Sequence, residues 1–302
     1  MPLPEHDIRH RMVTTPKRMQ TRRTFLAGCA ALALAPTRPA YSASVLRVGM
    51  TPALLNTQHG LLERLRSFME LQLKRPVLFV QRDSYRETID LLRLEQLDFA
   101  WICAYPYVNV RNSVRLVAVP LYHERPYYRA YLIVPEKAPH AASLLQLKDK
   151  VFAYADPYSN TGYLVPRYQL RVAGADPAKF FKRTFFTYSH SKVIEAVADG
   201  LADGGSVDGY IWDSLDMVKH EITSRTWPVS QSEEYGFPPF VANKGISQDS
   251  FAAMQRLLLT MRYNPEGKML LKALNLDGFT LGNDALYDNV ARMISVSGAE
   301  PL

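Results

Sequence analysis

The chain has 302 residues, with 36 Lys and Arg against 29 Asp and Glu, and a formal net charge of +7. Most of that charge lies in residues 1–43, where seven basic residues face two acidic ones, a net of +5, so the remaining chain is near +2. The remainder contains no basic run longer than a pair, and this argues against nucleic-acid binding, which draws on many cation–phosphate contacts.

The N-terminal segment has the pattern of an export signal. Residues 21–27, Thr-Arg-Arg-Thr-Phe-Leu-Ala, fit a twin-arginine motif, and small residues at 40–44 fit a cleavage site. The apolar run ends near Leu34, far short of the roughly 20 residues that span a bilayer. We therefore predict a signal peptide over residues 1–43 and a periplasmic protein that is not membrane-embedded. Cys29 also closes a lipoprotein-like box, but almost no apolar residues precede it, so lipidation is the less favoured alternative.

The residues after this segment alternate between strand and helix patterns, which indicates an α/β fold. A near-continuous apolar run at 99–103 is typical of a buried parallel strand. Strands are expected at 45–50, 77–80, 99–103, 116–121 and 128–134, and helices at 56–73 and around 85–94.

A second cycle of the same kind begins near residue 150. Strands are expected at 151–155, 185–188, 206–211 and 237–242, and helices at 162–173, 191–199, 248–262, 265–274 and 284–294. We predict two α/β lobes, one formed by residues 44–134 plus 239–302 and the other by residues 135–238. Two crossing strands, near Tyr131–Val134 and Pro239–Ala242, would form the hinge between them.

The clearest candidate for anion binding is the turn Tyr158–Gly162 at a predicted helix start. Unpaired backbone N–H groups and the positive end of the helix dipole favour an oxyanion there, and the side chains of Ser159, Asn160 and Thr161 add polar groups. The alternative is that this turn holds an ordinary N-cap.

Three further residues fall at the ends of predicted elements: Tyr85, His190 and Asp208. In open α/β sheets such ends face the ligand crevice. His190 could donate a hydrogen bond to an oxyanion and would titrate close to neutral pH. Each of the three could instead be a plain turn residue, and His190 a solvent-facing one.

Cys103 is the only cysteine after the export signal, so it has no intramolecular disulfide partner. It ends a predicted strand, and the flanking Trp101 and Tyr105 are candidates for a pocket wall. A thiolate is a soft ligand that suits trivalent arsenic better than phosphate. The alternative is a buried cysteine that only packs.

The remaining chemical classes find little support in the sequence. The cysteines and histidines do not have the close spacing of a metal-binding cluster. Cys103, His190 and Asp208 could be combined as nucleophile, base and orienting acid, but no known nucleophile signature surrounds them. We therefore predict a protein that is not an enzyme and needs no cofactor.

Several segments together resemble the phosphonate/phosphite-type periplasmic binding proteins, from Val45 to Ile294. Residues 98–108, Asp-Phe-Ala-Trp-Ile-Cys-Ala-Tyr-Pro-Tyr-Val, align without gaps with the family segment Asp-Ile-Ala-Tyr-Phe-Gly-Pro-x-x-Tyr-Val. Residues 156–162 match its Asp-Pro-x-Ser-Thr-Ser-Gly turn, and residues 238–245 match the return to the first lobe. The resemblance implies a type II periplasmic binding protein that closes on its ligand by hinge motion. It also implies ligand contacts from Tyr85, Ser159, Asn160, Thr161, His190 and Asp208.

Cys103 departs from this pattern, because it stands where the phosphonate binders have glycine. It is similar in this respect to the arsenite-sensing branch of the family, whose members pair with a membrane histidine kinase. Our first hypothesis is capture of arsenite through the Cys103 thiol, with Tyr85, Ser159, Thr161 and His190 bonding the arsenic hydroxyls. The alternative is the phosphonate-, phosphite- or phosphate-binding component of an ABC importer, with Cys103 merely packing.

Overall fold

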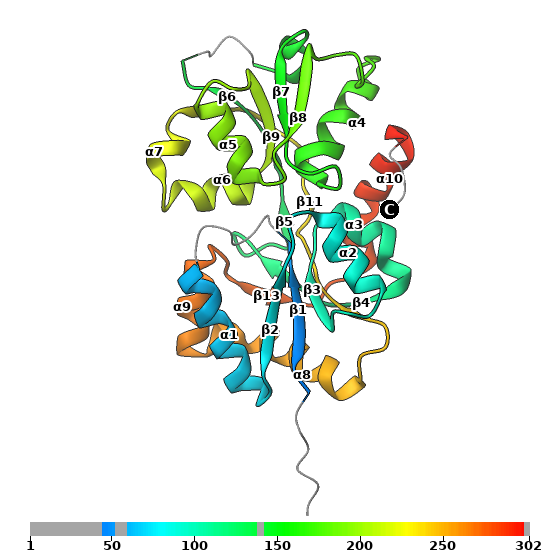
Figure 1. The fold of residues 1–302 in the computed structure, drawn as a ribbon, viewed down its shortest axis with the longest axis vertical. Helices are drawn as coiled ribbons and strands as arrows, with labels where there is room; N and C mark the ends of the chain where they lie inside the picture. Colours follow the sequence, from blue (N-terminus) through cyan, green and yellow to red (C-terminus); the bar gives the residue numbers. More distant parts are fainter. Residues whose placement is uncertain (1–43, 52–58, 138–141, 299–302) are drawn as a thin grey trace, which may run out of the picture. The chain divides into compact units, whose positions relative to one another are not determined.

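The computed structural model describes residues 44–51, 59–137 and 142–298 (Figure 1). The predicted signal peptide with Cys29, and the first three residues of the helix predicted at 56–73, lie outside the described residues. Within these ranges, no helix combines the length and the apolar character that crossing a membrane requires.

The first lobe is built on a six-stranded sheet in the order β13-β4-β12-β3-β1-β2. Strands β2, β1 and β3 run parallel, with β2 at the edge, and β12 runs antiparallel to both β3 and β4. The strands are β1 Leu46–Met50, β2 Val77–Gln81, β3 Phe99–Trp101, β4 Val114–Leu121, β12 Phe240–Asn243 and β13 Gly278–Thr280. The helices are α1 His59–Leu73, α2 Tyr85–Arg93, α3 Ala104–Val110, α8 Gln248–Thr260, α9 Pro265–Ala273 and α10 Asp288–Ser297.

The second lobe is built on a five-stranded sheet in the order β10-β6-β9-β7-β8. Strands β9, β7 and β8 run parallel, with β8 at the edge, and β6 and β10 run antiparallel at the other side. The position of β7 between two parallel strands explains the apolar character of 151–155. The strands are β6 Ala130–Pro135, β7 Val151–Tyr154, β8 Arg183–Phe186, β9 Gly204–Asp208 and β10 Thr226–Gln231. The helices are α4 Val165–Val172, α5 His190–Ala198, α6 Gly209–Asp216 and α7 His220–Thr223. The predicted two-lobe α/β architecture is confirmed.

The chain passes between the lobes through two very short strands, β5 Tyr127–Tyr128 and β11 Tyr235–Gly236, which pair antiparallel (Figure 1). The predicted crossings at 131–134 and 239–242 lie instead in β6 and β12, each inside one of the larger sheets. The lobe boundaries at residues 134 and 239 therefore remain a prediction. Both lie a few residues from the connecting strands β5 and β11.

Two predicted strands end earlier than expected, and each is followed directly by a helix. The run at 99–103 is a strand only to Trp101, and α3 starts at Ala104 with Cys103 at its N-cap position. Pro106 falls in the first turn of α3, where a missing N–H costs no helical hydrogen bond. The run at 206–211 ends at Asp208, whose carboxylate caps α6 by accepting from the Tyr210 amide. Strands β10 and β13 were not predicted.

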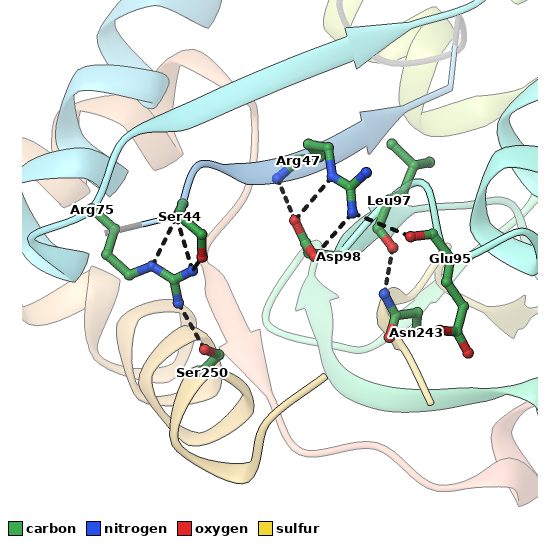
Figure 2. Close-up of polar contacts among 8 residues, drawn as sticks. All are labelled: Ser44, Arg47, Arg75, Glu95, Leu97, Asp98, Asn243 and Ser250. Atoms are coloured by element: carbon green, nitrogen blue, oxygen red, sulfur yellow. Dashed lines mark hydrogen bonds and ion pairs between the residues drawn. The ribbon is translucent and has the colours of Figure 1, made fainter. Parts of the chain in front are cut away.

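At the end of the first sheet where β1 and β3 begin, side-chain hydrogen bonds add to the backbone hydrogen bonds between the strands (Figure 2). The Asp98 carboxylate accepts from the Arg47 amide at 2.7 Å, and the Arg47 guanidinium lies 3.4 Å away. The Asn243 amide donates to the Asp98 carbonyl at 3.0 Å, and its side chain donates to the Leu97 carbonyl at 2.6 Å. These bonds connect β1, β3 and β12 at one level.

We expect Asn243→Ala to lower the free energy of unfolding by about 1–2 kcal/mol, because it leaves the buried Leu97 carbonyl without this donor. Urea denaturation measures the effect, and Asn112→Ala on the exposed surface is the matched control. Equal midpoints for both variants would contradict the assigned role of Asn243.

Candidate functional site

The predicted anion-binding turn is a real helix start. Ser159 occupies the N-cap position, and its hydroxyl accepts from the Gly162 amide at 2.9 Å. Residues Asn160–Leu164 form one π-helical turn that continues into α4. Ser159, Asn160 and Thr161 are all fully buried. The N-cap role explains why the Ser159 hydroxyl is buried, but it does not explain the buried side-chain oxygens of Asn160 and Thr161.

His190 lies beside this turn, at the start of α5. Its Nδ1 accepts from the Asp208 amide at 3.0 Å, so the ring hydrogen sits on Nε2, which faces the Ser159 hydroxyl at 3.2 Å. Burial lowers the pKa of His190 to about 3. The expectations of a ring that titrates near neutral pH, or of a solvent-facing one, are therefore wrong, because His190 is only 1% exposed.

Cys103 contacts the same turn from the first lobe. The Asn160 amide donates to the Cys103 sulfur at 3.4 Å, and the Tyr128 hydroxyl lies 3.9 Å from that sulfur. Burial raises the thiol pKa to about 11, against the opposing effect of the Asn160 amide. The residue is buried, as the packing alternative expects, yet its neighbours include polar groups from the other lobe.

Tyr128 was not predicted as a site residue. It lies in β5, and its hydroxyl accepts from the Asn160 side-chain amide at 3.1 Å, so it joins Cys103 and Asn160. Burial, followed by the nearby Cys103 and Asp208, holds its pKa well above the ordinary value. A two-residue strand has no periodic signal, and only its position between the lobes could have marked it.

Tyr85 and Asp156 form a second contact between the lobes. The Asp156 carboxylate accepts from the Tyr85 amide at 3.1 Å and from the Tyr158 amide at 2.8 Å. Burial, then the charges of Cys103, Asp156 and Asp208, hold the pKa of Tyr85 well above its usual value, while a hydrogen bond with Ser159 opposes them. Tyr85 therefore joins the predicted group, and Asp156 acts as a cap that spans the lobes.

Asp208 ends β9 and starts α6, where its carboxylate accepts from the Tyr210 amide at 2.9 Å. Burial raises its pKa to about 8, against the opposing hydrogen bonds from the Ile211 and Tyr210 amides. The raised pKa favours the protonated carboxyl. In that form Asp208 could donate a hydrogen bond to a ligand and would add no negative charge.

This shift predicts a stability effect with a definite sign. The side chain of Asp in an unfolded chain has a pKa of about 3.9. Between about pH 4 and about pH 8 the folded state therefore binds one proton more than the unfolded state. The free energy of unfolding consequently falls as the pH rises through that window. The variant Asp208→Asn lacks this titrating group, so its stability should not fall in the same way. In urea denaturation we therefore expect the free energy of unfolding of the variant minus that of the parent chain to increase from pH 5 to pH 8. A difference that stays constant with pH would contradict the assignment.

Two predicted wall residues are placed differently from each other. The Trp101 indole donates to the Pro238 carbonyl at 2.9 Å and packs against Phe279, so it faces the core of the first lobe. The Tyr105 ring lies 6.1 Å from the ring of Tyr158, the first residue of the turn. The structure thus brings Tyr105 to the edge of the site and gives Trp101 a role in the core.

The assembled group has neither the ligands of a metal centre nor a paired nucleophile and base. Among the described residues, no three His, Cys, Asp or Glu side chains lie close enough to hold a metal ion. His190 faces Ser159 and the Asp208 amide, and burial raises the pKa of the Cys103 thiol. The arrangement is a buried set of hydrogen-bonding groups and one sulfur, suited to holding a small polar solute.

Comparison with known proteins supports this description. The chain is 26% identical over 206 residues to the phosphonates-binding periplasmic protein of Escherichia coli, which covers 66% of this chain and 61% of that protein. It is 25% identical over 204 residues to a probable ABC transporter phosphite binding protein of Prochlorococcus marinus, covering 63% and 67%. The matched region thus spans less than two thirds of the Escherichia coli protein.

Solved structures show the same fold. A binding protein component of an ABC phosphonate transporter from Pseudomonas aeruginosa has a TM-score of 0.79, at 22% identity, over 85% of this chain and 87% of that one. The Prochlorococcus protein in complex with methylphosphonate has a TM-score of 0.76, at 20% identity, over 85% and 99%. Residues 48–287 match the family described as the phosphonate ABC transporter periplasmic substrate-binding protein, and the chain belongs to that family.

Proposed function

We propose that this protein is the solute-binding component of an ABC importer and that it captures a small phosphorus oxyacid, a phosphonate or phosphite, on the turn between its lobes. The observation that carries the proposal is a pair of polar atoms on this turn. Asn160 Oδ1 and Thr161 Oγ1 are buried and have no protein partner. A buried polar group without a partner costs about 1–3 kcal/mol, and a bound oxyacid would satisfy both.

The surrounding residues suit such a ligand. The turn of 5 residues continues into the 8 residues of α4 as one helical stretch, so its dipole and N–H groups favour oxygen atoms of a ligand. Tyr85, His190 and Asp208 reach the turn from α2, α5 and β9, that is, from both lobes. A ligand held by groups of both lobes would stabilise their closed arrangement. The permease would then bind that arrangement.

A protein with this function would act in the periplasm. Relatives with this fold are periplasmic substrate-binding proteins, and residues 21–27 have the twin-arginine pattern. We propose export by that route to the periplasm. Replacing Arg22 and Arg23 with Lys should retain the full-length precursor in the cytoplasm, measured by fractionation.

The ligand is tested by parallel calorimetric titration of the reduced chain, from residue 44 on, with methylphosphonate, phosphite, phosphate and arsenite. Saturable heat with methylphosphonate or phosphite supports the proposal. Heat with arsenite alone would replace it with the second candidate below, and no heat with any of the four would overturn both.

The second candidate is arsenite capture by a sensor that signals to a membrane histidine kinase. The observation that favours it is the position of the Cys103 sulfur, 3.4 Å from the Asn160 amide on the turn itself. Arsenous acid would condense with the thiol: the As–S bond forms, one As–O bond breaks, and the thiol proton leaves with that hydroxyl as water, with no change in oxidation state. A neutral acid also suits a site in which burial raises the pKa of both Asp208 and Cys103 and so favours their uncharged forms.

A further inference from the structure

The two unpartnered atoms on the turn differ in what they can accept or donate. The Asn160 Oδ1 atom is an amide oxygen, which only accepts, whereas the Thr161 hydroxyl can do either. The other polar groups of Asn160 at this point are occupied, because its amide donates to the Cys103 sulfur and its side-chain nitrogen donates to the Tyr128 hydroxyl. A ligand that satisfies Asn160 Oδ1 must therefore bring a hydrogen.

The neighbouring network fixes the direction of its hydrogen bonds. The Asp208 amide donates to His190 Nδ1, so the Nε2 hydrogen points at Ser159, whose hydroxyl also accepts from the Gly162 amide. The Ser159 hydrogen is then left for Tyr85, which agrees with the hydrogen bond that lowers the Tyr85 pKa. None of these hydrogens is directed to Asn160 Oδ1, so the protein does not satisfy it indirectly.

The positively charged groups near the turn are exposed or half-buried. The Arg86 guanidinium donates to the Tyr158 hydroxyl at 3.2 Å, Lys192 lines the same outer cleft, and the Arg167 guanidinium lies 5.0 Å from the centre of the Tyr163 ring. The buried titratable groups around the turn come from six positions and include no Lys or Arg among the described residues. The groups are Tyr85 on α2, Cys103 before α3, Tyr128 on β5, Asp156 after β7, His190 on α5 and Asp208 at the end of β9. At Asn160 a dianion would meet dipoles and no buried cation, and any of these acids that ionised would repel it.

We propose that the site binds its oxyacid in a form that still carries an acidic hydrogen, and that the ligand donates this hydrogen to Asn160 Oδ1. The inference rests on the proposed function, since it places the ligand on the turn. Singly ionised methylphosphonate and phosphite qualify, and so does neutral arsenous acid. Sulfate, a tetrahedral dianion with no hydrogen at neutral pH, does not.

The test is a series of calorimetric dissociation constants for methylphosphonate and phosphite from about pH 5.5 to about pH 9, with sulfate at neutral pH. We expect the affinity to fall about tenfold per pH unit above the second ionisation of each ligand. Because the two acids ionise at different pH values, the onset should differ between them. If arsenite is the ligand, its affinity should fall only above its first ionisation.

A common onset for both acids would assign the effect to a protein group such as Asp208 and would overturn the inference. So would affinity that does not change with pH, or sulfate binding as tight as that of phosphite. These outcomes leave the proposed function standing, because a ligand still binds. Binding of none of the acids at any pH would overturn the proposed function and this inference together.

Two variants test whether Asn160 Oδ1 accepts a hydrogen bond from the ligand or whether Asn160 only packs in the site. Asn160→Ala removes Oδ1 together with the bond to Tyr128, whereas Tyr128→Phe removes that bond and the 3.9 Å contact with the Cys103 sulfur but keeps Oδ1. We expect Asn160→Ala to weaken binding at least tenfold and to flatten the pH dependence, while Tyr128→Phe keeps the full slope. An unchanged slope in Asn160→Ala, with a normal thermal unfolding transition, would overturn the proposal.

Discussion

The variant Cys103→Ser, which exchanges one sulfur atom for oxygen, should lower the affinity for arsenite strongly and leave the affinity for phosphonate and phosphite nearly unchanged. Serine is nearly the same size, and its oxygen can still accept from the Asn160 amide, so the turn should keep its geometry. It cannot form the As–S bond, because a hydroxyl is not a soft ligand. We expect arsenite affinity, where the parent chain has it, to fall at least 100-fold, about 3 kcal/mol.

The same variant should leave methylphosphonate and phosphite affinity within about threefold, less than 1 kcal/mol, since these acids would use oxygen and N–H contacts. Calorimetry of the parent and the variant under reducing conditions measures both. Arsenite affinity that survives the change would refute the thiol hypothesis. Loss of binding for every ligand would instead show that Cys103 supports the shape of the site.

Gly162→Ala is expected to damage the turn itself. An added Cβ would lie 2.5 Å from the Ala155 Cβ, 2.9 Å from the His190 ring and 3.0 Å from the Ser159 hydroxyl. Both the N-cap and the His190–Ser159 contact must shift to accept it. Overpacking of this kind costs about 1–3 kcal/mol of unfolding free energy, and we expect binding of any ligand on the turn to fall more than about tenfold.

Gly60→Ala is the matched control, because an added Cβ on that exposed α1 residue meets nothing within 4 Å. Alanine is the better helix former, so this variant should bind normally and be at least as stable as the parent. Urea denaturation and calorimetry of both variants measure the effect. If Gly162→Ala bound its ligand as the parent does, the turn could not be the binding site.

Much of the fold could be read from the sequence because its signals are local. Apolar runs bounded by turns marked the central strands, and the spacing of Leu61, Leu65 and Phe68 marked α1, whose apolar face is buried. The turn at 158–162 could be found because a polar N-cap sequence at the start of a helix has a recognisable pattern. Short edge strands such as β13 have too few residues for any period to appear.

The parts of the site that escaped prediction depend on tertiary contacts. Residues 101 and 103 would share a face if the strand continued, since side chains alternate with a period of two. The strand stops at Trp101, so the indole faces the core while Cys103 turns toward Asn160. Burial of His190 and the contacts of Tyr128 come from elements far away in sequence, and no local pattern encodes them.

The most direct test of the account is a crystal structure of the chain with whichever of methylphosphonate, phosphite or arsenite binds in solution. We expect the central atom of the ligand to lie on the turn, with an oxygen within hydrogen-bonding distance of Asn160 Oδ1 and Thr161 Oγ1. Arsenic would in addition be bonded to the Cys103 sulfur. A ligand seated instead in the outer cleft lined by Arg86, Tyr158 and Lys192, or in the one lined by Lys268 and Lys272, would contradict it.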